Sequence, residues 1–286
     1  MADVDLATFE RFTSKRDVGR SKVALGSLAR RVLLGLLPVA LFLGAWSLVS
    51  ALGVWDEVFV PRPAAVWDRL VESVTIHDGR RGLSDHYLWE HLGASLRRIL
   101  KGVGWAIVVG VPVGLLIATV RPVAVLLEPY VNFIRSLPPL AYFSLLIIWF
   151  GIEDTSKVWL LFLAAVAPIA VAVSTGARSV RRDQLDAARS LGASRFQVVV
   201  HTVLPSVLPD LMTGIRLAVG FAWTTIVAAE TVDGIPGIGG LAWSTKKFQQ
   251  TDVAVLCVLV IGATALLLDH LIRVVDRALV PWRGQA

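Results

Sequence analysis

The sequence predicts an all-α integral membrane protein with six transmembrane helices. The first observation behind this prediction is the composition: 55% of the 286 residues are hydrophobic, 17% are charged, and the mean hydropathy is +0.68. Soluble domains are about 45–50% apolar and about 25% charged, so the excess apolar surface here needs lipid as its solvent. The second observation is a series of long uncharged windows, because a helix needs about 20 residues to cross a bilayer core.

These uncharged windows fall into two groups. The stronger windows have the length of a full span, and they are 32–55, 102–120 and 158–177. The weaker windows reach that length only by including a flanking polar residue, and they are 136–152, 217–229 and 253–268. We expect the weaker spans to line the interior of a helix bundle. With their flanks, the six spans are placed approximately at 32–55, 102–120, 130–152, 158–178, 209–230 and 253–275.

A basic tail, residues 1–30, precedes the transmembrane domain, residues 31–286. The first window is not a cleaved signal peptide, because it is too long, follows the polar tail and lacks a small-residue cleavage site. With the N-terminus in the cytoplasm, the inside segments carry more of the 28 Lys and Arg residues than the outside segments do. This bias predicts that both termini are cytoplasmic. Membrane orientation also explains the pI near 9.9, so no nucleic-acid partner is expected.

A short amphipathic segment, residues 91–102, leads into the second span with the sequence HLGASLRRILKG. Its apolar side chains, from Leu92 to Leu100, share one helical face, and Arg97, Arg98 and Lys101 lie elsewhere. The pattern is typical of an interfacial helix that lies along the outer leaflet. We prefer this interpretation to a binding site.

Residue patterns for catalysis or for metal binding are lacking. There is no Gly-x-x-x-x-Gly-Lys-Ser/Thr phosphate loop, so we do not expect nucleotide hydrolysis by this chain. The glycine-rich stretch Gly234 to Gly240 has the wrong spacing for a dinucleotide fingerprint and is interpreted as a flexible turn. His86 and His91 alone are weak evidence for a metal, and the single Cys257 cannot build a cysteine-based site. We therefore expect neither an enzyme active site nor a metal site.

A charged residue and two prolines mark the third span. Arg135 precedes Pro138 and Pro139, and prolines inside a span remove backbone hydrogen bonds and kink the helix, as at a gate. Arg135 could meet an anionic group in transit through the membrane. Alternatively, Arg135 snorkels to the cytoplasmic boundary or pairs with Glu128, and we favour this alternative.

Three further residues are candidates for the substrate pathway. Glu230 ends the fifth span on the outer side, where it faces a pathway, faces a partner protein or is simply solvated. Trp223 and Trp243 either line a passage or belong to the aromatic belts at the membrane surfaces. With ten tryptophans in the chain, the belt is the default interpretation.

A polar interruption, Asp183 to Pro205, separates the fourth and fifth spans on the cytoplasmic side. Asp183 can N-cap a helix, with Asp186 in the first turn and Ala187 and Ala188 favouring helix without bulk. Gly192 fits a left-handed C-terminal cap.

A second short helix is expected after this glycine. Ser194 and Gln197 form a capping box, and the helix is expected to end before Pro205. Two capped helices with a smooth alanine face are either a connecting loop or a docking element for a soluble partner, and spacing alone leaves both interpretations open.

The same residues resemble the EAA signature of the permease subunits of ABC importers. That signature is Glu-Ala-Ala, three residues, Gly, nine residues, Ile, one residue and Leu-Pro; here Asp186-Ala187-Ala188, Gly192 and Leu204-Pro205 keep the spacing. Asp186 replaces the usual Glu, and Thr202 occupies the Ile position. The resemblance implies that Asp186, Ala187, Ala188, Gly192, Ser194, Leu204 and Pro205 belong to a cytoplasmic coupling helix region that inserts into a groove on an ATPase.

The resemblance covers nearly all of residues 30–286. The stretches SLPPLAYFSLLIIWFGIEDTSKVWLL, LMTGIRLAVGFAW, TIVAAET, FQQTDV and LVPWRGQA are similar to the taurine/sulfonate/nitrate branch, above all to taurine permeases. It implies a type I (MetI-like) permease fold in a bacterial inner membrane. The implied partners are a second permease copy as a homodimer, a cytoplasmic ATPase dimer that binds ATP and magnesium, and a periplasmic substrate-binding protein. The expected function is ATP-driven import of taurine or a related alkanesulfonate by alternating access; nitrate or another organic sulfur anion, and a stand-alone secondary carrier, are the alternatives.

Overall fold

The computed structural model describes residues 37–53, 55–77 and 79–282, which divide into two compact units after Ala65. The first unit contains an apolar helix, Leu37–Ala51, within the predicted first span. In that unit the Trp46 indole Nε1 donates a hydrogen bond to the Pro61 carbonyl at 3.0 Å. The predicted basic tail, residues 1–30, lies outside the described residues.

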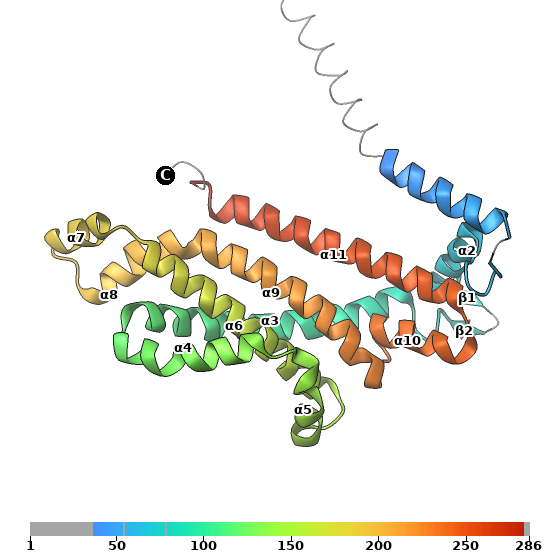
Figure 1. Cartoon of the computed structure of the whole chain (residues 1–286), viewed down its shortest axis with the longest axis horizontal. Helices are drawn as coiled ribbons and strands as arrows, with labels where there is room; N and C mark the ends of the chain where they lie inside the picture. The colour runs from blue at the N-terminus through green and yellow to red at the C-terminus, as the bar shows by residue number, and fades with distance from the viewer. Residues whose placement is uncertain (1–36, 54, 78, 283–286) are drawn as a thin grey trace, which may run out of the picture. The chain divides into compact units, whose positions relative to one another are not determined.

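The second unit, from Val66 onward, is almost entirely helical (Figure 1). Helix α2 (Pro63–Val74) leads into it, and a two-stranded antiparallel hairpin follows, in which Ile76 of β1 (Ile76–His77) pairs with Arg81 of β2 (Arg80–Arg81). The remaining elements are α3 (Leu88–Thr119), α4 (Arg121–Ser136), the 3₁₀ turn η1 (Pro139–Ala141), α5 (Phe143–Phe150), α6 (Asp154–Ser179), α7 (Arg182–Ser190), α8 (Arg195–Val198), the π-helical turn η2 (Val199–Val203), α9 (Leu204–Asp233), α10 (Ile238–Phe248) and α11 (Thr251–Leu279).

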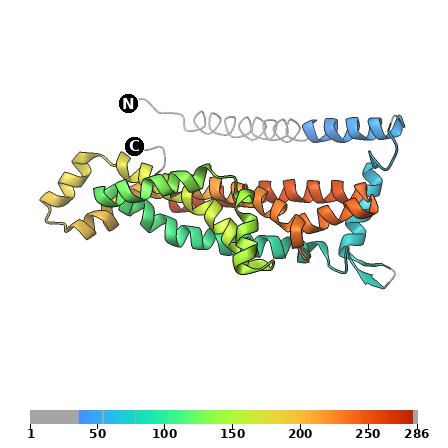
Figure 2. The same ribbon diagram turned by 60° about the horizontal axis from the view of Figure 1, so that its bottom comes forward.

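The core of this unit is a three-helix contact in which α6 lies between α3 and α9, as Figure 2 shows from a second side. Small residues let α3 and α6 approach closely, as they do at many membrane helix interfaces. A Cβ added at Gly114 would lie 2.6 Å from the Ala170 carbonyl oxygen and 2.7 Å from the Val173 Cβ. Leu161, Ile169 and other apolar side chains fill the seam.

Four helices of the described chain are long and apolar enough to cross a membrane. They are α3, α6, the continuous helical segment Arg195–Asp233 and α11. α6, Arg195–Asp233 and α11 each contain one of the spans expected from hydropathy and extend beyond it, and α3 covers the span 102–120 except for Val120. Long apolar helices of this kind are what the prediction of an all-α membrane protein requires.

The predicted third span, 130–152, is not one helix. It is divided into α4, η1 and α5, with Leu137 and Pro138 in extended conformations between α4 and η1. Proline disfavours helical backbone at the residue before it, and Pro139 supplies no N–H donor to continue the ladder. The pair therefore interrupts the helix instead of kinking it.

The predicted interfacial helix before the second span is also wrong. Residues 91–102 belong to α3, which runs without a break from Leu88 to Thr119. The apolar face packs into the bundle, where Ile99 is buried and Leu92 and Leu96 contact the core. Since that face is covered by protein, the segment does not need to lie along a lipid surface.

Candidate functional site

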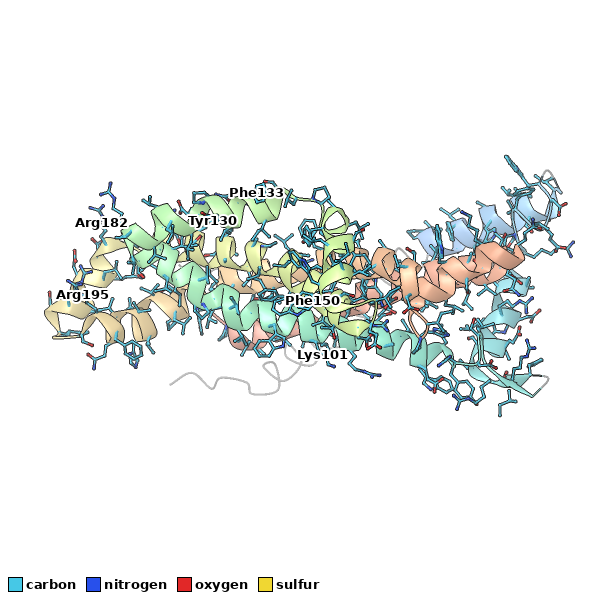
Figure 3. The ribbon with its side chains drawn as sticks, turned by 90° about the horizontal axis from the view of Figure 1, so that it is seen from below. Lys101, Tyr130, Phe133, Phe150, Arg182 and Arg195 are labelled. Atoms are coloured by element: carbon cyan, nitrogen blue, oxygen red, sulfur yellow. The ribbon has the colours of Figure 1, made fainter. Side chains whose placement is uncertain are left out.

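The predicted coupling region, residues 183–205, projects at one end of the second unit (Figure 3). Together with Arg181 and Arg182, which begin its first helix, it is called the coupling segment below. Helix α7 begins two residues earlier than predicted, with Arg181 at the N-cap position and no side-chain cap. Asp183 is therefore not the cap. It lies in the first turn, where its charge complements the helix dipole. It also forms an ion pair with Arg181, whose Nη2 lies 3.0 Å from Asp183 Oδ2.

The turn between α7 and α8 has the predicted conformation. Gly192 has a φ of +83°, and its N–H donates to the Arg189 carbonyl at 2.9 Å. The capping box is also present: Ser194 N donates to the Gln197 side chain at 2.8 Å, and Gln197 N donates to Ser194 Oγ at 3.3 Å. The left-handed glycine and the capping box were both deduced from residue type and spacing, and the structure confirms both.

The end of the second helix differs from the prediction. Helical structure continues through Leu204 and Pro205, so that α8, η2 and α9 form one run from Arg195 to Asp233. The N–H of Leu204 donates to the Val199 carbonyl, a wider turn than the α-helical one. Because Pro205 has no N–H and its ring crowds the preceding turn, a π turn lets the helix pass through the proline. The coupling segment is thereby continuous with a transmembrane helix.

Two large apolar side chains that are not among the predicted site residues are exposed on the coupling segment. Leu191 is 89% exposed and Phe196 is 76% exposed. Asp186 and Ala187 are also exposed, and Ala188 is half-buried. A shallow pocket of about 380 Å³ lies beside them, and its lining is Ala188, Leu191, Gly192, Ala193, Gln197, His201 and Thr202. Apolar residues that flank a glycine turn inside a polar segment were the signal available in the sequence.

A cavity of about 480 Å³ opens between α4, η1, α6 and α9. Two predicted pathway residues, Arg135 and Pro139, line it, whereas Pro138 does not. Its other lining residues are Ile134, Leu137, Tyr142, Ala164, Pro168, Val171, Ala172, Thr175, Asp210, Thr213, Gly214, Leu217 and Phe221. The cavity wall is mainly apolar. Its polar lining residues Thr175 and Asp210 lie on α6 and α9, and hydropathy along the sequence does not show that these two helices bring them to one cavity.

Arg135 does not pair with Glu128, which corrects one of the two interpretations of this residue. Glu128 pairs with Arg178 instead, and Arg178 also donates to the Ile117 carbonyl at 3.3 Å. Across the described residues no ion pair is formed by Arg135, and the side chain is exposed. An unpaired guanidinium at a cavity wall can receive an anion in bidentate geometry.

A second, more polar cavity of about 260 Å³ adjoins the first. Val171 and Thr175 line both cavities, and the second is also lined by Asn132, Ser174 and the Arg178–Glu128 pair. The two cavities therefore follow α6 toward the coupling end of the unit.

Glu230, predicted to be at the outer edge of a span, is buried in a network at the opposite end from the coupling segment. Its side chain is fully buried and pairs with Arg98, whose Nη1 lies 2.6 Å from Oε1. Ser95 Oγ donates to Oε1 at 2.8 Å, and the Gly239 N–H donates to Oε2 at 2.9 Å. Arg98 also reaches Asp154 at 2.6 Å. The interpretation of Glu230 as a solvated residue is therefore wrong, because its side chain is 0% exposed, and it does not line the cavity that contains Arg135.

The glycine-rich stretch before α10 is part of the same network and is not a flexible turn. The Gly237 N–H donates to His91 Nδ1 at 3.1 Å, and the Ile238 N–H donates to Ser95 Oγ at 3.1 Å. His91 Nε2 lies 3.1 Å from the Leu83 carbonyl. Hydrogen bonds from two helices thus hold this segment in place.

The two candidate tryptophans have different surroundings. Trp223 is buried and donates from Nε1 to the Ile261 carbonyl of α11 at 3.2 Å, so it faces a neighbouring helix and not the cavity. Trp243 is half exposed on α10, and the Lys246 ammonium lies 4.9 Å from its ring centroid. Neither residue lines the cavity that contains Arg135.

Long apolar helices with a polar segment between two of them define the class as an integral membrane protein. The chain belongs to the family of binding-protein-dependent transport system inner membrane components, whose model matches residues 110–284.

Among curated proteins, the chain is 39% identical to the taurine transport system permease protein TauC of Escherichia coli K12, over 90% of this chain and 92% of that protein. It is 32% identical to the putative aliphatic sulfonates transport permease protein SsuC of the same organism, over 86% and 90% of the two chains. It is 31% identical to the bicarbonate transport system permease protein CmpB of Synechococcus elongatus, over 85% and 88%. These relatives place the chain among ABC-importer permeases of the taurine, sulfonate and bicarbonate group.

The fold is similar to that of solved permeases. A structure described as the inward-facing MetNI methionine ABC transporter aligns with a TM-score of 0.60 at 20% identity, over 67% of this chain and 95% of that one. A second crystal form aligns with a TM-score of 0.55. The similarity confirms the MetI-like helical architecture expected from the sequence.

Proposed function

We propose that this chain is the permease subunit of an ATP-driven importer for taurine or a related alkanesulfonate. The observation that carries the proposal is the 39% identity to a taurine permease over nine-tenths of the chain. An importer of this class needs two permease subunits, two ATPase subunits and a substrate-binding protein. This chain supplies the membrane route, and ATP and magnesium are bound by the ATPase subunits.

The coupling segment supports an ATPase partner. Leu191 and Phe196 are exposed beside the small side chains of Ala187 and Ala188, and large exposed apolar residues mark protein contacts. The predicted orientation puts this segment and both termini in the cytoplasm of the inner membrane, where ATP is available. Asp186, Gly192 and Ser194 then shape the part that docks.

The continuous helix from Arg195 to Asp233 supports a mechanism for coupling. Its first turns belong to the coupling segment, and further along it Asp210, Thr213 and Phe221 line the cavity that contains Arg135. A helix transmits a rigid displacement along its length, so movement of α8 by a closing ATPase shifts the cavity wall. That shift is the element needed for alternating access.

Arg135 supports an anionic substrate. It is the only arginine lining this cavity, and among the described residues it forms no ion pair with a carboxylate, so it can meet a sulfonate group in transit. The exposed aromatic side chains Tyr130 and Phe133, both labelled on α4 in Figure 3, suit contact with a second permease copy.

The test is reconstitution of the chain with its cognate ATPase and binding protein in proteoliposomes. We expect ATP-dependent uptake of labelled taurine, with competition by alkanesulfonates exceeding that by nitrate or bicarbonate. Uptake of bicarbonate or nitrate in preference to taurine would reassign the substrate. Uptake by the chain alone without ATP would contradict the proposal and indicate a secondary carrier.

A further inference from the structure

An apolar groove opens on the side of the bundle where α3 and α6 meet. It has a volume of about 450 Å³ and is lined by Trp105, Val109, Val158, Trp159 and Phe162. Trp159 stacks on Phe150 and meets Phe162 edge-on, in both cases with ring centroids 5.4 Å apart. These contacts hold the groove wall in shape, while Trp105 on the other wall is 61% exposed.

The groove lies at the level where hydrocarbon begins. On α3 the uncharged window starts directly after Lys101, and on α6 it starts directly after Lys157. The two helices are in contact at this level, because a Cβ added at Gly102 would lie 2.5 Å from the Leu161 Cβ. On α3, an exposed tryptophan at this depth, Trp105, with the exposed Lys101 one turn above it, is typical of the lipid headgroup region.

Two exposed cations lie immediately above the groove. Arg97, Lys101 and Trp105 follow one another at four-residue spacing, so they share one face of α3. In the described part of the chain neither Arg97 nor Lys101 has an ion-pair partner, and Figure 3 shows the Lys101 side chain extending away from the bundle. The neighbouring Arg98 is the opposite case, since it is buried and paired with Glu230 and Asp154.

We propose that this groove binds an anionic phospholipid of the surrounding membrane. An acyl chain lies along Trp105 and Trp159, and the phosphate group contacts Arg97 and Lys101. The apolar wall matches a lipid tail, and the two unpaired cations match a headgroup with net negative charge better than a zwitterionic one. The groove and the Arg135 cavity share no lining residue, so the inference does not depend on which substrate is transported.

The test is native mass spectrometry of the full chain, purified in detergent with equal amounts of phosphatidylglycerol and phosphatidylcholine. We expect preferential retention of phosphatidylglycerol, and a loss of that preference by about tenfold in the double variant Arg97→Ala, Lys101→Ala, since each cation near a membrane surface contributes to anionic lipid binding. Trp105→Ala should lower retention of both lipids, because it removes the acyl contact. Equal retention of phosphatidylglycerol by the wild type and the double variant would overturn the proposal.

Lys246→Ala is the matched control, because Lys246 is also an exposed lysine beside a tryptophan, Trp243, but lies on α10 outside the groove. We expect this variant to retain phosphatidylglycerol like the wild type. An equal loss in the control would show that the lipid binds by general surface charge, which contradicts a defined site.

Protein could cover the groove instead of lipid, and cysteine cross-linking distinguishes the two. Cys257 is the single cysteine and is buried, so a Cys257→Ser background leaves only introduced thiols. In membranes, Trp159→Cys is expected to stay unlinked both alone and together with Leu43→Cys. Efficient disulfide formation in either variant would show that a second copy or the helix Leu37–Ala51 occupies the groove, and the lipid proposal would fail.

Discussion

The ion pairs at the two ends of the helical unit differ in solvent exposure. At the coupling end, the pairs Arg181–Asp183 and Arg189–Asp186 have side chains that are 63–81% exposed. At the other end, the Arg98 and Glu230 side chains are 7% and 0% exposed. Exposed pairs contribute about 0–1 kcal/mol, whereas breaking a buried pair costs about 3–5 kcal/mol. The buried end links helices α3, α6 and α9 through Arg98, Asp154 and Glu230, whereas the charged side chains at the exposed end are accessible to another protein.

The largest expected effect is at the buried end. Glu230→Ala should lower the free energy of unfolding by about 3–5 kcal/mol, because Arg98 is then buried with only Asp154 as an acidic partner. The Gly239 N–H also loses its acceptor. Thermal unfolding of the detergent-solubilised chain, followed by tryptophan fluorescence, measures the change.

The control for Glu230→Ala is a double-mutant cycle with Arg98→Met. Removing both charges should cost less than the sum of the two single substitutions, since neither partner is left alone. Strictly additive losses would show that the pair is not coupled and would remove the basis of the comparison.

A smaller effect is expected at the contact between α3 and α6. Gly114→Ala should destabilise the chain by about 1–3 kcal/mol, because the added methyl group would overlap the backbone of α6 near Ala170. Gly104 provides a matched control on the same helix, since nothing lies within 4 Å of a Cβ added there. We expect Gly104→Ala to be neutral or stabilising, and the difference between the two unfolding midpoints measures the closeness of the helices.

How far the sequence predicts these regions depends on the separation of the interacting residues. Gly192 and the Ser194–Gln197 box were predictable because capping chemistry acts over a few residues. The long spans were predictable because hydropathy is a local average. Arg98 and Glu230 are 132 residues apart, and the apolar pattern says only that Arg97, Arg98 and Lys101 lie off the apolar face. Only the packing of α3 against its neighbours separates the buried arginine from the two exposed cations.

The sequence also did not predict that the helix continues through Pro205. Pro205 was interpreted as the end of a helix, since proline usually breaks the hydrogen-bond ladder. The π turn at η2 provides another solution, in which the helix widens for one turn and then continues. Nothing in the residues Val199–Val203 indicates whether the helix stops before Pro205 or widens into a π turn there.

At the coupling end, the turn itself should be more sensitive than the charges around it. Gly192→Ala is expected to cost roughly 1–2 kcal/mol, because φ is +83° although nothing would contact the new Cβ. Gly192→Asn should cost less, since asparagine tolerates the left-handed region. Hydrogen exchange of the Gly192 and Ala193 amides measures local opening; equal protection in all three proteins would contradict a strained turn.

The smallest effect on stability is expected on the exposed face of α7, where the functional effect should be the largest. Ala187→Arg should change the free energy of unfolding by no more than about 0.5 kcal/mol, because the side chain enters solvent. If this face docks an ATPase, the added bulk and charge should abolish co-purification of the ATPase and ATP-driven uptake, whereas Ala187→Ser, which stays small, should preserve both. Normal uptake by Ala187→Arg would remove the docking assignment. Loss of uptake with an unchanged unfolding midpoint would show that this end of the molecule is shaped for a partner and contributes little to its own fold.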